Sequence, residues 1–175
     1  MFRYKKSVAF ENLEKELDQF SEKIEGLKLP KGFSKTVLYI TSEIFANIKE
    51  HSHAGKTFIN IKIGKKNAEI DIADDGIGFR TSYLRKKIYP KDDFSAIEFA
   101  LSGLSTKDSQ ERGFGLYSIK KLAEALGGQL MIKTGLAEAT IEKNRITFHK
   151  LKKRTVGTLI GFKSPIKSVN FYKII

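Results

Sequence analysis

The apolar positions of the chain repeat first with the period of a helix. This spacing predicts an amphipathic helix between residues 9 and 27, because apolar side chains recur there three and four positions apart, at Phe10, Leu13, Leu17, Phe20 and Ile24. The stretch Leu29-Pro30-Lys31-Gly32 then breaks the pattern. Ser34 offers a side-chain cap for a second predicted helix, which runs to about Glu50.

The period then changes to that of β-strands. Residues 57–64 alternate, with Ile59, Ile61 and Ile63 on one side, and a turn leads into a second apolar stretch. This pattern predicts a β-hairpin with one buried face. A third helix is predicted over 114–126 and is ended by Gly127-Gly128. The remaining apolar stretches predict strands, at 69–73, 129–134, 139–149 and 156–163.

Residues 80–112 show mixed periodicity and many charges between elements that are clearly patterned. A segment of this length is typical of a lid over a ligand site. The order of elements predicts an α/β (α+β) fold, a two-layer sandwich of a mixed, mostly antiparallel sheet with helices on one face. We expect one main domain at residues 34–175, preceded by an N-terminal amphipathic helix extension at residues 1–33.

Composition narrows the function classes without choosing one. The 175 residues are 41% hydrophobic, which suits a folded domain, and contain no Cys, which excludes disulfides and thiolate chemistry. The net charge of +12 predicts attraction to anions such as nucleotides, nucleic acid or acidic proteins. No apolar run reaches the length of a membrane span and none resembles a signal peptide, so we expect a cytoplasmic protein with no membrane partner.

Three short motifs carry candidate chemistry. Glu43, Asn47 and His51 share one polar face of the second predicted helix. The sequence Asp-Asp-Gly-Ile-Gly at 74–78 places an acid at a strand end beside glycines, which allow close backbone approach to a ligand. The glycine-rich entry to the third helix, at 112–116, would present backbone N–H groups to phosphate. Each motif alone is more typical of a solvated helix face or of an ordinary turn than of a ligand site.

In combination the motifs are far more specific. The segments at 43–51, 74–78, 113–116 and 156–158 resemble, in order and spacing, the N, G1, G2 and terminal Gly-Thr motifs of the GHKL superfamily. That superfamily comprises gyrase-type topoisomerases, heat-shock chaperones of the ninety-kilodalton class, histidine kinases and mismatch-repair ATPases. Residues 115–130 look most like histidine kinases and anti-sigma-factor serine kinases. The resemblance implies the Bergerat ATP-binding fold, with ATP and Mg²⁺ as cofactors.

The resemblance also implies a role for individual residues. Asp74 would accept a hydrogen bond from the adenine amino group with support from Thr158, Asn47 would supply an oxygen to Mg²⁺, and Glu43 would be the general base. His51 would order the site, and Lys107 in the lid would meet the γ-phosphate. The implied ATP-binding residues are Asn47, His51, Asp74, Gly76, Gly78, Phe79, Thr106, Lys107, Gly113, Phe114, Gly115, Leu116 and Thr158.

Two departures from histidine kinases affect the prediction. Glu43 stands where those kinases usually have Asn, which favours hydrolysis or serine phosphorylation over phosphorylation of histidine. The interval from Gly128 to Gly157 is longer than in compact kinase domains, which predicts an extra hairpin at 135–152.

Three functions remain open from the sequence. The first is a slow ATPase or protein serine kinase that regulates a protein partner, and the second is an ATP-gated interaction switch without significant catalysis. A DNA-associated ATPase is the least favoured, because the basic residues look dispersed along the chain. The partner is not identified by the sequence, and a homodimer is one arrangement that it allows.

Overall fold

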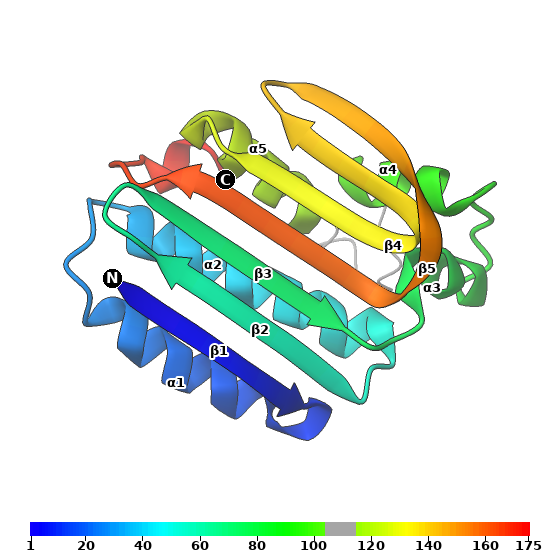
Figure 1. Cartoon of the computed structure of the whole chain (residues 1–175), viewed down its shortest axis with the longest axis horizontal. Coiled ribbons are helices and arrows are strands. Elements are labelled where there is room, and N and C mark those ends of the chain that lie inside the picture. The colour runs from blue at the N-terminus through cyan, green and yellow to red at the C-terminus, as the bar shows by residue number, and fades with distance from the viewer. Residues whose placement is uncertain (104–114) are drawn as a thin grey trace.

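A five-stranded sheet forms one layer of the molecule (Figure 1). The computed structural model describes residues 1–103 and 115–175. The strand order is β1-β2-β3-β5-β4, and every pairing is antiparallel, where a mixed but mostly antiparallel sheet was predicted. The strands are β1 (Phe2–Ala9), β2 (Lys56–Ile63), β3 (Asn67–Asp74), β4 (Gln129–Glu142) and β5 (Arg145–Pro165).

Helices form the second layer. In Figure 1, α1, α2 and α5 lie behind the sheet, on the same face, which confirms the predicted two-layer sandwich. The α-helices are α1 (Leu13–Glu25), α2 (Phe33–Asn47), α3 (Gly78–Arg85), α4 (Asp93–Leu101) and α5 (Gly115–Leu126). Three short helical segments accompany them: η1 (Phe10–Asn12), η2 (Ile48–Ser52) and η3 (Phe171–Lys173).

The core fills the space between these layers. The predicted inward face of the first hairpin is confirmed, because Ile59, Ile61 and Ile63 of β2 are all buried. Phe58 points to the opposite face of the sheet and is 49% exposed. Burial of apolar side chains on one face of each strand therefore fixes which face the helices cover.

Strand β1 was not predicted. It pairs with β2 from Phe2 opposite Ile63 to Ala9 opposite Lys56, so it forms one edge of the sheet. The predicted helix at 9–27 follows it as the shorter α1, whose buried side chains belong to the same core as the rest of the chain. Residues 1–33, expected as an extension, thus share the sheet and core of residues 34–175. The domain boundary between them stays a prediction.

The start of α2 differs from the predicted one. Gly32, with φ of +80°, occupies the N-cap, and no side chain caps the helix, so the prediction that Ser34 is the cap was wrong. The α-helix ends at Asn47, before the predicted end at Glu50. The chain continues as one turn of π-helix, Ile48–Ser52, which widens the helix directly after Asn47.

The three strands predicted after α5 are two long strands. Lys143 and Asn144 both have positive φ, of 50° and 60°, as a two-residue hairpin turn requires. The pairing of β4 with β5 is irregular on both sides of Gly135. Beyond that irregularity the two strands continue as a hairpin, here called the arm (residues 135–155), which confirms the extra hairpin predicted at 135–152.

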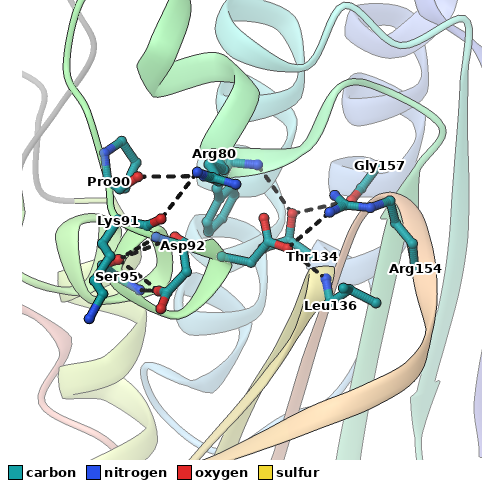
Figure 2. Close-up of polar contacts among 11 residues, drawn as sticks. Arg80, Pro90, Lys91, Asp92, Ser95, Thr134, Leu136, Arg154 and Gly157 are labelled. Atoms are coloured by element: carbon teal, nitrogen blue, oxygen red, sulfur yellow. Dashed lines mark hydrogen bonds and ion pairs between the residues drawn. The ribbon is translucent and has the colours of Figure 1, made fainter.

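The predicted lid at 80–112 contains two helices in its described part, α3 and α4. Asp92 caps α4: its Oδ1 accepts a hydrogen bond from the Ser95 backbone N–H at 2.9 Å, and the Ser95 hydroxyl accepts from the Asp92 N–H at 2.9 Å. The Arg80 guanidinium donates to the carbonyls of Pro90 and Lys91, and so holds the connection between α3 and α4 (Figure 2). Residues 104–114 lie outside the described part of the chain.

Candidate functional site

A cleft of about 750 Å³, open solvent included, lies between the helices and the sheet. It brings together α2 and η2, the end of β3, the middle of β5, helices α3 and α4, and the start of α5. Its walls are mostly apolar, with a few polar groups among them, as in most small-molecule sites. The lining residues are Ile44, Asn47, Ile48, His51, Ser52, Ile72, Asp74, Gly78, Phe79, Ser82, Tyr83, Ala100, Gly115, Leu116, Thr158 and Ile160.

Asp74 is the buried acid of the cleft. It is the last residue of β3 and is 6% exposed. Burial raises the pKa of its carboxyl to about 6, and hydrogen bonds from the backbone N–H groups of Gly76 and Thr158 offset part of that rise. The Gly76 N–H donates to Asp74 Oδ1 at 2.8 Å. The structure therefore keeps a partly desolvated carboxyl group at the cleft, where it can accept a hydrogen bond from a ligand.

Two glycines let the backbone pass close to this carboxyl. A β-carbon on Gly76 would lie 2.8 Å from Asp74 Oδ1, and one on Gly157 would lie 2.6 Å from the same atom. Gly157 also has a positive φ of 64°. Any side chain at either position would push into Asp74, so glycine is required for the shape of this wall.

Thr134 of β4 connects two walls of the cleft, a role that sequence reasoning missed. Its Oγ1 accepts a hydrogen bond from the Phe79 N–H at 3.1 Å and donates to the Gly157 carbonyl at 3.3 Å. Figure 2 shows Thr134 beside Gly157 at this junction. The side chain is 1% exposed, and it joins the start of α3 to the Gly-Thr segment of β5.

Ser52 makes a similar connection on the other side of the cleft. It is the last residue of η2, and its carbonyl accepts a hydrogen bond from the Ile77 N–H at 2.8 Å. The π-helical turn therefore anchors the loop that follows Asp74. No feature of the sequence distinguishes Ser52 or Thr134 from the other Ser and Thr residues.

At the far end of the cleft, α2 faces the beginning of α5. The Glu43 carboxylate packs so closely on Gly115 that no β-carbon would fit there, and Asn47 Nδ2 would lie 3.7 Å from such an atom. Gly115 and Leu116 open α5, where backbone N–H groups have no partner within the helix. The end of a helix that carries these groups attracts anions. A carboxylate and an amide thus stand beside a potential phosphate cradle.

The structure brings most of the sequence-predicted site residues together. Glu43 and Gly76 border the cleft, as described above, and His51 lies in its wall, 3.8 Å from Glu50 in an ion-pair geometry. The predicted site residues that line the cleft are Asn47, His51, Asp74, Gly78, Phe79, Gly115, Leu116 and Thr158. Four others lie outside the described residues: Thr106, Lys107, Gly113 and Phe114. Ser82, Tyr83 and Ala100 were missed, because they come from the segment whose periodicity gave no clear elements.

The fold and the cleft together define a nucleotide-binding domain. The family model for the histidine kinase-, DNA gyrase B- and HSP90-like ATPases matches residues 33–158, so the chain belongs to this family. No curated protein matches the chain significantly. The family confirms the predicted resemblance and gives the coarse function, an ATP-binding domain of the histidine-kinase-like ATPase type. None of the described helices is long and apolar enough to cross a membrane, and a cytoplasmic location stays a prediction.

Proposed function

We propose that this protein is an enzyme that uses Mg²⁺-bound ATP, a slow ATPase or a protein serine kinase that regulates a protein partner in the cytoplasm. The observation that carries the proposal is the position of Glu43, whose carboxylate packs on Gly115 at the start of α5. A base in this place faces the end of the cleft that suits phosphates. A protein that only held ATP would not need a carboxylate beside the anionic end of its ligand, where it costs binding energy.

The adenine end of the nucleotide is assigned to Asp74. Its buried carboxylate can accept a hydrogen bond from the amino group of adenine, whereas guanine would present a carbonyl to it, acceptor against acceptor. Thr158, which is buried next to this carboxyl, would support the contact. This pair supports selection of ATP over GTP.

The residues present fit a magnesium ion held mainly by phosphate. The described residues contain no cluster of three or more His, Cys, Asp or Glu side chains that could hold a metal. Asn47 offers one amide oxygen at the cleft wall, and Mg²⁺ is commonly held by one or two protein oxygens together with phosphates and water. When bound, the ion would neutralise charge on the phosphates.

Glu43 would act on the attacking group. As general base it takes the proton of a water or of a serine hydroxyl while that oxygen bonds to the γ-phosphorus and the bond to ADP breaks. The proton therefore ends on the carboxylate, and ADP leaves with the electron pair of the broken bond. The partly exposed position of Glu43 leaves it accessible to a substrate.

The substitution Glu43→Gln tests this role. It keeps the size of the side chain and removes the base, so we expect ATP affinity to stay within about threefold while phosphate release or transfer falls by about 10² to 10⁴-fold. The measurements are phosphate release and ATP titration, each with and without proteins co-purified from native lysate. Glu22→Gln, an exposed glutamate on α1 that does not line the cleft, is the matched control.

The contrary outcome is a wild type that binds ATP tightly but turns it over no faster than the Glu43→Gln variant, even with a partner present. Such an outcome would contradict the proposal that the protein is an enzyme. That result would favour the ATP-gated interaction switch. A wild type that does not bind ATP would contradict both the enzyme and the interaction switch.

A further inference from the structure

The net positive charge of the chain is concentrated near its C-terminus, because the basic residues continue there while the acidic ones do not. Residues 143–175 contain nine Lys and Arg residues and no Asp or Glu, so this stretch contributes +9 to the net charge of +12. Residues 1–142 hold the other 23 basic residues and all 20 acidic ones. Such an asymmetry within one chain is typical of proteins that bind a polyanion.

The arm displays much of this charge on one edge. Strand β3 last pairs with β5 at Ala73 opposite Leu159, so the part of β5 that lies in the arm pairs with β4 alone among the described strands. Residues 150–154 of this part of β5, here called the basic edge, carry four exposed cations: Lys150, Lys152, Lys153 and Arg154. Figure 1 shows this stretch of β5 curving away from the rest of the sheet.

The acidic residues of the arm do not neutralise the basic edge. Glu138 lies on β4 and forms an ion pair with Lys133 at 2.9 Å, and Glu142 accepts a hydrogen bond from Gln129. Only the guanidinium of Arg154 has an acidic partner among the described residues, Asp93 Oδ2 at 3.4 Å. Lys150, Lys152 and Lys153 form no ion pair with any of the described residues.

The contact with Asp93 fixes the root of the basic edge. Asp93 begins α4, is 7% exposed, and its Oδ2 also accepts the Leu136 N–H at 2.8 Å. Figure 2 shows Arg154 reaching this junction beside Leu136. The three lysines that precede Arg154 are thus carried by a strand that is anchored at its base and free to meet a partner.

We propose that the basic edge binds the phosphodiester backbone of double-stranded nucleic acid. Three of its four cations have no acidic partner among the described residues, so they can neutralise the closely spaced phosphates of a duplex, which carries one negative charge per about 1.7 Å of helix axis. Lys and Arg side chains are sufficient for such contacts, which do not read sequence. The proposal is independent of the function of the nucleotide cleft.

Two features disfavour a protein at this surface. Val156 is exposed beside the basic edge, but one apolar side chain is far less than the apolar centre of a protein interface. A partner strand could not extend the sheet regularly here, because the register between Ala137–Lys150 and Gly135–Thr155 is interrupted and residues 151–154 form a bulge.

The test is a binding titration with labelled duplexes of DNA and of RNA, each about 30 base pairs long, at a series of salt concentrations. The variant K150A/K152A/K153A removes three cations, and K15A/K65A/K66A, three exposed lysines elsewhere, removes the same charge. We expect the arm variant to bind at least about tenfold more weakly at low salt and its salt slope to fall by about 2.7, at about 0.9 per lost phosphate contact. Thermal unfolding and ATP binding of both variants report whether fold and cleft are intact.

Comparison of the two duplexes shows whether DNA or RNA is the preferred ligand. Binding of either duplex supports the proposal. Equal losses in both variants would overturn it, because net charge alone would then explain the binding. So would stronger binding of the wild type to poly-glutamate or to phosphatidylserine vesicles at the same salt, since an acidic protein or a membrane surface would then be the better partner.

Discussion

At the scale of single residues, Asp74 lowers stability in favour of binding. Its pKa of about 6 lies above the value of 3.8 that applies without burial, so folding favours the protonated form. The stability that comes from the neutral carboxyl is complete below about pH 4 and is lost as the pH rises through about 6. At neutral pH the ionised group therefore costs free energy, of the order of 3 kcal/mol. That cost is acceptable because the charged form is the better acceptor for adenine.

Asp74→Asn should accordingly stabilise the free protein. We expect a gain of about 1 to 3 kcal/mol in urea unfolding at about pH 7.5 that shrinks toward zero near about pH 4, because the neutral amide keeps an oxygen that can accept the Gly76 N–H. The same variant should lose ATP binding, since an amide does not select the adenine amino group.

Asp18→Asn is the matched control for this prediction. Asp18 is exposed on α1 and is not among the groups that shift the pKa of Asp74, so it has no buried charge to relieve. A gain in stability shared by both variants, or one that does not depend on pH, would contradict the assignment of the cost to burial of Asp74.

The sequence predicted those site residues whose chemistry and spacing are unusual. An acid followed by glycines at a strand end, or Glu and Asn one turn apart on a helix, stands out from ordinary patterns. Thr134 and Ser52 do not, because their importance comes from the residues that the fold places beside them, Phe79 and Gly157 for one and Ile77 for the other. Such tertiary partners leave no local signal.

At the scale of elements, β1 shows how one inward-facing charge can conceal a strand. Phe2, Tyr4 and Val8 alternate as a strand requires, but Lys6 occupies the remaining inward position and breaks the pattern. The structure accommodates it through Glu16 of α1, whose carboxylate lies 2.8 Å from Lys6 Nζ and also accepts the Tyr4 hydroxyl. The compensating charge lies in another element, so alternation alone could not predict the strand.

The packing of α1 on this strand gives a prediction about the N-terminal residues. Phe20 is 1% exposed and its ring lies 5.1 Å from that of Tyr4, centre to centre. Phe20→Ala should lower the free energy of unfolding by about 3 to 5 kcal/mol, as expected for a large buried aromatic side chain. We expect the whole urea transition to shift, because residues 1–33 share the core of the molecule.

Lys15→Ala, an exposed change on the same helix, should leave the transition within about 0.5 kcal/mol. A Phe20→Ala protein whose main transition does not move, with an early separate loss of helix signal, would show instead that the N-terminal residues are the independent extension expected from the sequence.

At the scale of the whole molecule, nucleotide selection should appear as a difference in thermal stability. A ligand present at about 100 times its Kd adds about 2.7 kcal/mol, which for a chain of this size raises Tm by about 5 to 11 °C. ATP with Mg²⁺ should produce this shift, and GTP with Mg²⁺ should produce little, because Asp74 pairs with the amino group of adenine. The measurement is differential scanning fluorimetry at fixed nucleotide and magnesium concentrations. Equal shifts with both nucleotides would contradict the adenine assignment.

The strand order also determines when each part of the sheet can form. A two-residue turn joins β4 to β5 and a short one joins β2 to β3, whereas residues 10–55 separate β1 from β2. Closing that longer loop costs about 2 kcal/mol more in chain entropy than closing a hairpin. On the ribosome, β1 emerges before the other four strands of this sheet, yet its partner follows only after α1 and α2 have been synthesised. β1 therefore waits for its first neighbour longer than β2 or β4 does, and Lys6 and its basic neighbours in β1 keep that waiting edge soluble.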